Sequence, residues 1–186
     1  MRQYFQDGHS RRTRKAIIPD LVEGMRPVGP AIAVAAQGAD ILLTSVAAAL
    51  PGYHVGQGLG IPTAGVFLLP TAPTGDFPPA VLGMRSTGRW GNRLIATVAG
   101  MGERIFLPQL NDLRRDLGLP PTTVRAIHRE QRERRWPILH GFSEHVVPRP
   151  HDWRPGLDRT GYWWPHPQTT VARAPLRSGC APGCRP

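Results

Sequence analysis

IPTAGVFLL, residues 61–69, is the second of two short apolar runs in this chain, and DILLTS, residues 40–45, is the first. Polar or turn-forming residues bound both runs, and their centres do not alternate between apolar and polar side chains. This pattern is typical of parallel strands that are buried on both faces. WPILH at residues 136–140 and a short segment around residues 160–164 predict a third and a fourth strand.

Helical periodicity fills the intervals between the predicted strands. It begins at residues 19–37, where Pro27 and Pro30 predict a late start or a kink and Gly38 a left-handed stop. Residues 46–60 are weakly helical, and Pro51-Gly52 is expected to break them.

The longest helical pattern covers residues 92–117, and its apolar stripe rotates at Pro108. The rotation predicts a kink or two abutting helices. Thr122 or Thr123 can cap a further, arginine-rich helix that runs to Arg135.

Helices alternating with short apolar strands predict an α/β fold with a parallel sheet flanked by helices on both faces. With three or four strands, we expect a partial Rossmann-like domain, because doubly wound sheets usually have more. We assign residues 1–18 to an irregular segment, 19–165 to this domain, and 166–186 to a disordered tail rich in Pro, Arg and Gly.

Composition argues against a nucleic-acid partner despite a net charge of +10 and a pI near 11.2. Lys15 is the only lysine, so the excess is almost entirely arginine. The basic residues are not interleaved with aromatics and match no nucleic-acid-binding motif. The arginine-rich run at 125–135 also carries glutamates, so we interpret it as a solvated helix face, with an anionic partner as the alternative.

The N-terminal residues and the cysteine content favour a cytoplasmic protein. The first 15 residues lack the apolar core of a secretory signal. Residues 31–50 are apolar enough to suggest a membrane span, but Gln37, Gly38 and Asp40 interrupt them. Cys180 and Cys184 lie together near the C-terminus, where they could form a disulfide or contribute to a metal site, and neither reading requires an oxidising compartment.

Two candidate ligand motifs have simpler interpretations. The glycines of GQGLG, residues 56–60, precede a predicted strand, whereas a phosphate-cradling loop must follow one, so we predict a helix-to-strand turn. His140, His145 and His151 show no metal-ligand spacing, and we interpret them as solvated or hydrogen-bonded loop histidines. We therefore predict no metal site and no bound cofactor.

The loop after residues 61–69 is the strongest candidate site. It leaves the C-terminal end of a predicted parallel strand, where α/β sheets bind ligands. Its prolines, hydroxyls and aromatics suit an apolar molecule that carries a hydroxyl, although a loop that serves only packing is the alternative. The predicted acceptor-binding residues are Thr71, Thr74, Phe77, Trp90 and Asn92.

Three segments together resemble a known family: GADILLTS with GLGIPTAGVFLLPTAPTGDFP, then GNRLI with LPQLNDLRRDLGLPP, then PILHGFSEHVVPRPHDWRPGLDRTGYWW. They resemble the UDP-dependent glycosyltransferases that glucosylate sterols, macrolides and glycopeptide aglycones. The resemblance covers residues 19–165 and is most specific at 143–164. It implies the N-terminal, acceptor-binding half of a GT-B fold and a lipophilic acceptor.

The resemblance also implies a catalytic base and a donor-binding domain outside residues 19–165. The family transfers sugar from a UDP-sugar with inversion and without a metal, using a base on the N-terminal domain. Its first strand, glycine-rich loop and base should precede residue 19, and its donor domain should follow residue 165. We find none of them here, so we carry over no catalytic residue.

Two hypotheses follow. The first is a truncated or frameshifted glycosyltransferase that is inactive alone, with a separately encoded donor domain as a candidate partner and peripheral membrane contact allowed. The second is a small basic binding protein without catalysis.

Overall fold

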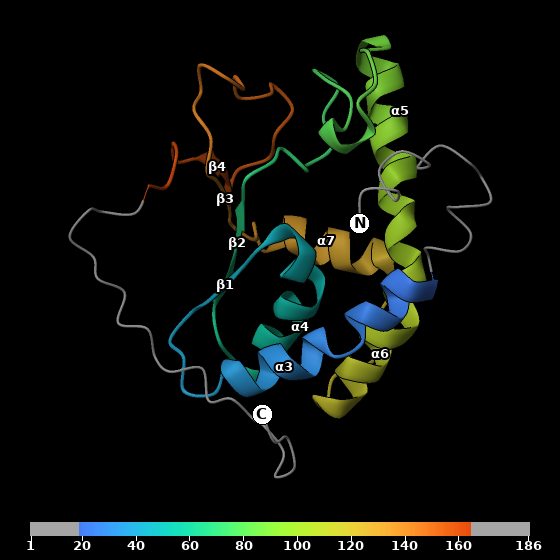
Figure 1. Cartoon of the computed structure of the whole chain (residues 1–186), viewed down its shortest axis with the longest axis vertical. Coiled ribbons are helices and arrows are strands. Elements are labelled where there is room, and N and C mark those ends of the chain that lie inside the picture. Colours follow the sequence, from blue (N-terminus) through green and yellow to red (C-terminus); the bar gives the residue numbers. More distant parts are fainter. Residues whose placement is uncertain (1–18, 165–186) are drawn as a thin grey trace, which may run out of the picture.

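The computed structural model describes residues 19–164. Its centre is a parallel sheet of four strands in the order β1-β2-β3-β4, formed by Leu42–Thr44, Thr63–Phe67, Ile138–His140 and Leu157–Arg159 (Figure 1). The prediction of a partial α/β domain with a parallel sheet is confirmed.

Helical segments connect the strands. Residues 19–25 are helical and precede α3 (Val28–Ala35). Between β1 and β2 lie η1 (Val46–Ala48) and α4 (Ala49–Leu59), and between β2 and β3 lie η2 (Ala80–Leu82), α5 (Gly88–Gly100), η3 (Met101–Phe106), α6 (Leu107–Asp116) and α7 (Val124–Glu133).

The strand order explains where the helices lie. Parallel crossovers are almost always right-handed, so strands added in sequential order place every connecting helix on the same face of the sheet. Figure 1 shows the described helices on one side of the strands. The prediction that helices cover both faces is therefore not met within residues 19–164.

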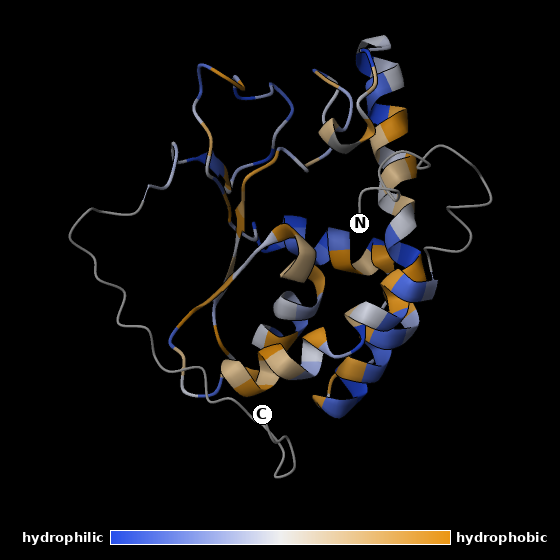
Figure 2. Ribbon diagram, in the orientation of Figure 1, coloured by the Kyte–Doolittle hydropathy of each residue, from blue (hydrophilic) through white to orange (hydrophobic). Residues whose placement is uncertain are grey.

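The face of the sheet that no helix of residues 19–164 covers is apolar at β1. Leu43 is 55% exposed, and neighbouring Ile41 is also exposed. On the covered face, Thr44 is buried against α4, where a Cβ on Gly52 would lie 2.2 Å from the Thr44 methyl carbon. Figure 2 shows apolar colour along β1 and β2.

Several predicted element boundaries are confirmed. Gly38 has a φ of 75°, as a left-handed stop requires. The Thr123 hydroxyl caps α7 by accepting the N–H of Ala126 at 3.3 Å. The 92–117 pattern divides into α5 and α6, and Pro108 lies in the first turn of α6, where its missing N–H costs no hydrogen bond.

Two predictions about local structure were wrong, and the helix-to-strand turn predicted for GQGLG is met at Gly60 alone. α4 runs unbroken through Pro51-Gly52, because Pro51 occupies the first turn, where helical N–H groups have no partner. Gly56 and Gly58 lie within α4, and of the GQGLG glycines Gly60 forms the turn, at a φ of 68°. The fourth strand is β4 at Leu157–Arg159, not residues 160–164.

Two hydrophobic clusters hold the layers together. An aromatic cluster runs along the covered face of the sheet, from Trp136 just before β3 to Phe67 at the end of β2, and includes Trp153. An aliphatic cluster joins α3, α4, α6 and α7 through Val55, Leu113 and Ile127, among others. In residues 19–164, no helix combines the length and hydropathy needed to cross a membrane.

Candidate functional site

A cavity of about 820 Å³ lies between the sheet and the helices. Its floor includes Phe67 and Ile138 from β2 and β3, and its walls come from the N-terminal helices, α4, α5, α6 and α7. Val46, after β1, and Thr71, after β2, place one part of it at the C-terminal ends of these strands, and Trp136 and Leu157 extend it toward the starts of β3 and β4. The C-terminal edge is where parallel α/β sheets bind ligands.

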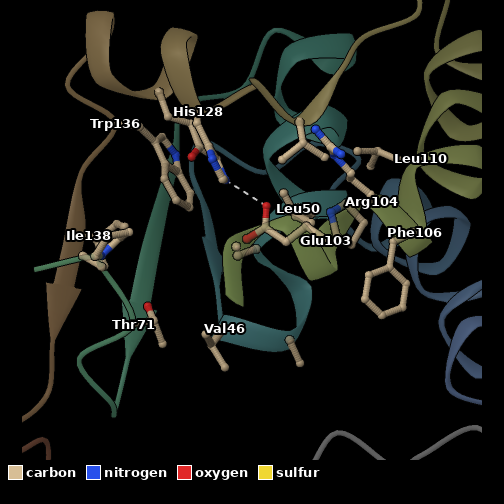
Figure 3. Close-up of a pocket in the computed structure, with 18 of the residues that line it drawn as sticks. Val46, Leu50, Thr71, Glu103, Arg104, Phe106, Leu110, His128, Trp136 and Ile138 are labelled. Atoms are coloured by element: carbon tan, nitrogen blue, oxygen red, sulfur yellow. Dashed lines mark hydrogen bonds and ion pairs between the residues drawn. The ribbon is translucent and has the colours of Figure 1, made fainter. Parts of the chain in front are cut away.

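Most of the cavity wall is apolar. Figure 3 shows the side chains of Val46, Leu50, Leu110, Trp136 and Ile138 around the space. Trp136 is held in place because its indole N–H donates to the hydroxyl of Thr63 at 2.8 Å. Such a volume and lining suit an apolar molecule, since small-molecule pockets usually occupy about 300–1,000 Å³.

A histidine–carboxylate pair interrupts the apolar wall. Nε2 of His128, on α7, lies 2.8 Å from Oε2 of Glu103, on η3. The two side chains are 40% and 35% exposed, so both remain accessible from the cavity. Figure 3 shows the pair between Trp136 and Arg104.

Six arginines also line the cavity: Arg26, Arg93, Arg104, Arg125, Arg132 and Arg154. Some are already engaged, since Arg93 lies 3.5 Å from Asp152 and Arg154 donates to the carbonyl of Trp136 at 2.8 Å. Arg104, Arg125 and Arg132 have no ion pair among residues 19–164. The cavity therefore has an apolar body and a basic margin.

The structure separates the five predicted acceptor residues. Thr71 is exposed and lines the large cavity. Trp90 is 87% exposed and lines a smaller cavity of about 230 Å³ with Gly75 and Arg89. Arg93 lines both cavities. Phe77 is half-buried and lines neither.

Thr74 and Asn92 are buried, and internal hydrogen bonds use their polar groups. The Thr74 hydroxyl donates to Asp152 Oδ1 at 2.6 Å and accepts the N–H of Asp76 at 3.0 Å. The Asn92 amide donates to the carbonyl of Gly75 and accepts the N–H of Thr87, both at 3.0 Å. These two residues shape the loop that follows β2.

The three histidines considered as metal ligands lie in different environments. His140 is a fully buried residue of β3, stacked on Trp153 with 4.6 Å between ring centroids, so its interpretation as a loop histidine was wrong. His151 is exposed and lies 3.0 Å from Asp76, and His145 is exposed. Within residues 19–164, no cluster of His, Asp or Glu could hold a metal ion; Cys180 and Cys184 lie outside this range.

Sequence reasoning missed the main cavity residues. His128 stands in a run of arginines and glutamates, which is the pattern of a solvated helix face, and Glu103 lies where two helical stripes meet. The two residues are 25 positions apart, and only the packing of α7 on η3 brings them together. Val46 and Leu50 carried no signal beyond weak helical propensity.

Much of this sequence recurs in known proteins. The chain is 34% identical over 133 residues to a sterol 3-beta-glucosyltransferase of Leptosphaeria maculans, and 32% identical over 117 residues to one of Arabidopsis thaliana. These alignments cover 70% and 60% of this chain. The chain is homologous to the sterol glucosyltransferases.

The homologous region is a small part of these glucosyltransferases. The chain spans 9% of the Leptosphaeria protein and 18% of the Arabidopsis protein. A UDP-sugar-dependent glycosyltransferase of Dictyostelium discoideum also matches, at 32% identity over 64% of this chain. No protein-family model matches the chain.

Proposed function

We propose that this chain forms the acceptor-binding part of a glycosyltransferase and holds a lipophilic alcohol, of sterol type, in the cavity of about 820 Å³. The observation that carries the proposal is the position of this apolar cavity at the C-terminal ends of β1 and β2, in a homologue of proteins named as sterol glucosyltransferases. In this proposal the acceptor's hydroxyl receives a sugar from a UDP-sugar.

The predicted loop residues take different parts in this proposal. Thr71 contacts the ligand, whereas Thr74 and Asn92 hold the loop in position through their buried hydrogen bonds. Trp90 lines the smaller cavity, which shares Arg93 with the large one, and in this proposal it contributes apolar area beside the site, whereas Phe77 lines neither cavity. The contacts made by Phe77 and Trp90 remain predictions.

The donor sugar is proposed to bind elsewhere. A nucleoside diphosphate is commonly bound at a glycine-rich turn between a strand and the N-terminus of the following helix. The GQGLG glycines instead lie in α4 and at its C-terminal end. We therefore propose that transfer needs a donor-binding domain that this chain meets as a partner, in the cytoplasm, with peripheral membrane contact where the lipophilic acceptor resides.

A binding experiment tests the cavity. A fluorescent sterol delivered from cyclodextrin should accept energy from tryptophan, because Trp136 and Trp153 line the cavity. Val46→Trp should block binding, since Val46 is 48% exposed and projects into the space without serving the buried core. Val34→Trp is the control, because Val34 is 69% exposed on α3 and lines neither cavity. Equal sterol affinity in the two variants would reject the cavity as the site.

A transfer experiment tests the need for a partner. The purified chain, incubated with UDP-glucose and a panel of sterols and macrolides, should form no glucoside. Turnover above a heat-inactivated control would contradict the proposal that the donor site lies elsewhere. The alternative of a non-catalytic basic binding protein is not favoured, since the matching relatives are named as glycosyltransferases.

A further inference from the structure

The cavity wall contains two carboxylates, and they differ in how far the protein already satisfies them. Asp152 accepts the Thr74 hydroxyl at 2.6 Å and the N–H of Gly75 at 2.9 Å, and it also lies 3.5 Å from Arg93. Glu103 contacts His128 through Oε2, and its Oε1 has no hydrogen-bond partner among residues 19–164. Glu103 is therefore the carboxylate that can accept a further hydrogen bond.

The apolar surroundings of Glu103 determine which ligand can supply this hydrogen bond. Leu50, Leu110, Trp136 and Ile138 lie around the same space (Figure 3). A ligand that fills this space with an apolar body excludes water from the carboxylate and must replace the lost hydrogen bonds, since a buried unpaired charge is costly. A ligand with one suitably placed polar group meets this need, and a wholly apolar ligand does not.

We infer that the Glu103–His128 pair is the polar anchor of the cavity and binds the hydroxyl of a lipophilic alcohol. This inference rests on the proposed function. The alcohol O–H donates to Glu103 Oε1, while His128 holds the carboxylate in place through its contact with Oε2. Glu103 is thus a ligand-binding residue, and His128 is a positioning residue.

The chemistry of the pair predicts which ligands it selects. An ionised carboxylate only accepts hydrogen bonds, and Nε2 of His128 occupies one of the two Glu103 oxygens. Glu103 Oε1, the oxygen that His128 leaves free, therefore presents an acceptor alone to the ligand. It favours an alcohol, which can donate, over a ketone of the same shape, which cannot.

The arginines on the cavity margin offer the opposite chemistry. Arg104, Arg125 and Arg132 are donors without an acceptor function, so they bind a ketone oxygen as readily as an alcohol oxygen and favour an anionic group. A ligand anchored by these residues would not discriminate in favour of the alcohol. The ratio of affinities for alcohol and ketone therefore tells which group of residues receives the polar end of the ligand.

The test uses three ligands with the same apolar body: 5α-cholestan-3β-ol, 5α-cholestan-3-one and 5α-cholestane. Their affinities for the full chain are measured by displacement of a fluorescent sterol. A hydrogen bond to a charged group predicts that the alcohol binds roughly tenfold or more tightly than the ketone or the hydrocarbon. Equal affinities, or a preference for the ketone, would overturn the inference.

Variants of Glu103 and His128 test whether these two residues cause the preference for the alcohol. Glu103→Gln should bring the affinities for the alcohol and the ketone within about threefold of each other, because an amide both donates and accepts. His128→Ala should also reduce the preference, and His128→Gln should restore much of it, since an amide N–H can still donate to Glu103. Rescue by glutamine is not expected if His128 matters only for packing.

The control is the exposed pair of Asp112 and Arg115 on α6, which has the same 2.8 Å contact and does not line the cavity. Asp112→Asn should leave the ligand ratios unchanged. An intact preference for the alcohol in Glu103→Gln overturns the inference while the proposed function stands. Failure of all three ligands to bind the unmodified chain rejects the proposed function itself, and the anchor with it.

Discussion

The Thr74 hydroxyl donates to Asp152 Oδ1 at 2.6 Å across 78 positions of sequence, and the N–H of Gly75 donates to the other oxygen of the same carboxylate at 2.9 Å. The Asp152 side chain is 10% exposed. This carboxylate joins the loop after β2 to the segment between β3 and β4, and so fixes one side of the cavity mouth.

Asp152→Asn should lower the free energy of unfolding by about 1–3 kcal/mol at neutral pH, because an amide cannot accept both hydrogen bonds. Burial by itself would raise the pKa of Asp152, but the Thr74 hydroxyl, the Gly75 N–H and Arg93 outweigh it and hold the pKa below its ordinary value. A depressed carboxyl pKa stabilises the fold above the unfolded value of about 3.9, and this contribution disappears as the pH falls through the folded-state pKa.

Urea unfolding across acidic pH checks this prediction. The difference between the unmodified chain and Asp152→Asn should be constant above about pH 5 and should begin to shrink below about pH 4. A difference that grew on acidification would contradict the assignment.

His54 should make the fold sensitive to mild acid. Burial is the main cause that lowers the pKa of His54 to about 4. The hydrogen bond to Gln57 acts in the opposite direction and raises the pKa, and the nearby Arg114 cation lowers it. Because the unfolded pKa is about 6.5, the unfolded chain binds a proton first, and on the order of 3 kcal/mol of stability is lost as the pH falls from about 6.5 to 4. Chemical unfolding at a series of pH values measures this slope.

His54→Gln should flatten that slope, whatever its effect on stability at neutral pH. Burial also lowers the pKa of His140, so part of the slope should persist in this variant. His145→Gln serves as the control, because His145 is an exposed side chain and should leave the slope unchanged. Identical slopes in His54→Gln and the unmodified chain would reject His54 as a source of acid sensitivity.

Gly52→Ala should destabilise the chain by about 1–3 kcal/mol, because the new Cβ would lie 2.2 Å from the Thr44 methyl carbon and force β1 and α4 apart. Thr44→Ser removes that methyl and keeps the hydroxyl, so the double variant should recover much of the loss. Gly24→Ala is the control, since a Cβ on Gly24 would meet no neighbouring atom within 4 Å. Additive effects of the two substitutions in thermal unfolding would contradict close packing at this contact.

Leu43→Lys should reduce self-association without loss of stability. Leu43 is 55% exposed on the uncovered face of β1, which is an edge strand within residues 19–164. A lysine on an edge strand discourages strand pairing between molecules. Sedimentation velocity measures the association, with Leu94→Lys on α5 as a control, since Leu94 is 66% exposed away from the sheet. A monomeric unmodified chain would remove the basis for this prediction.

The sequence alone determined the fold class and most of its elements. Unbroken apolar runs predict parallel strands, since a strand covered on both faces must be apolar on both, but within residues 19–164 helices cover only one face and leave Leu43 exposed. Local rules also placed the Thr123 cap and the stop at Gly38, since each depends on the chemistry of one residue and its neighbours along the chain. The loop after β2 stood out because its position follows from the strand before it.

Tertiary structure decided everything that depends on separation in the chain. Pro51 resembled a helix breaker until its place in the first turn of α4 was known. Thr74 and Asn92 looked like ligand-binding groups, and only the fold shows that partners such as Asp152 and Gly75 use their polar atoms. Glu103 and His128 form a pair because α7 packs on η3. The residues next to each of them in sequence do not determine which helix its side chain will contact.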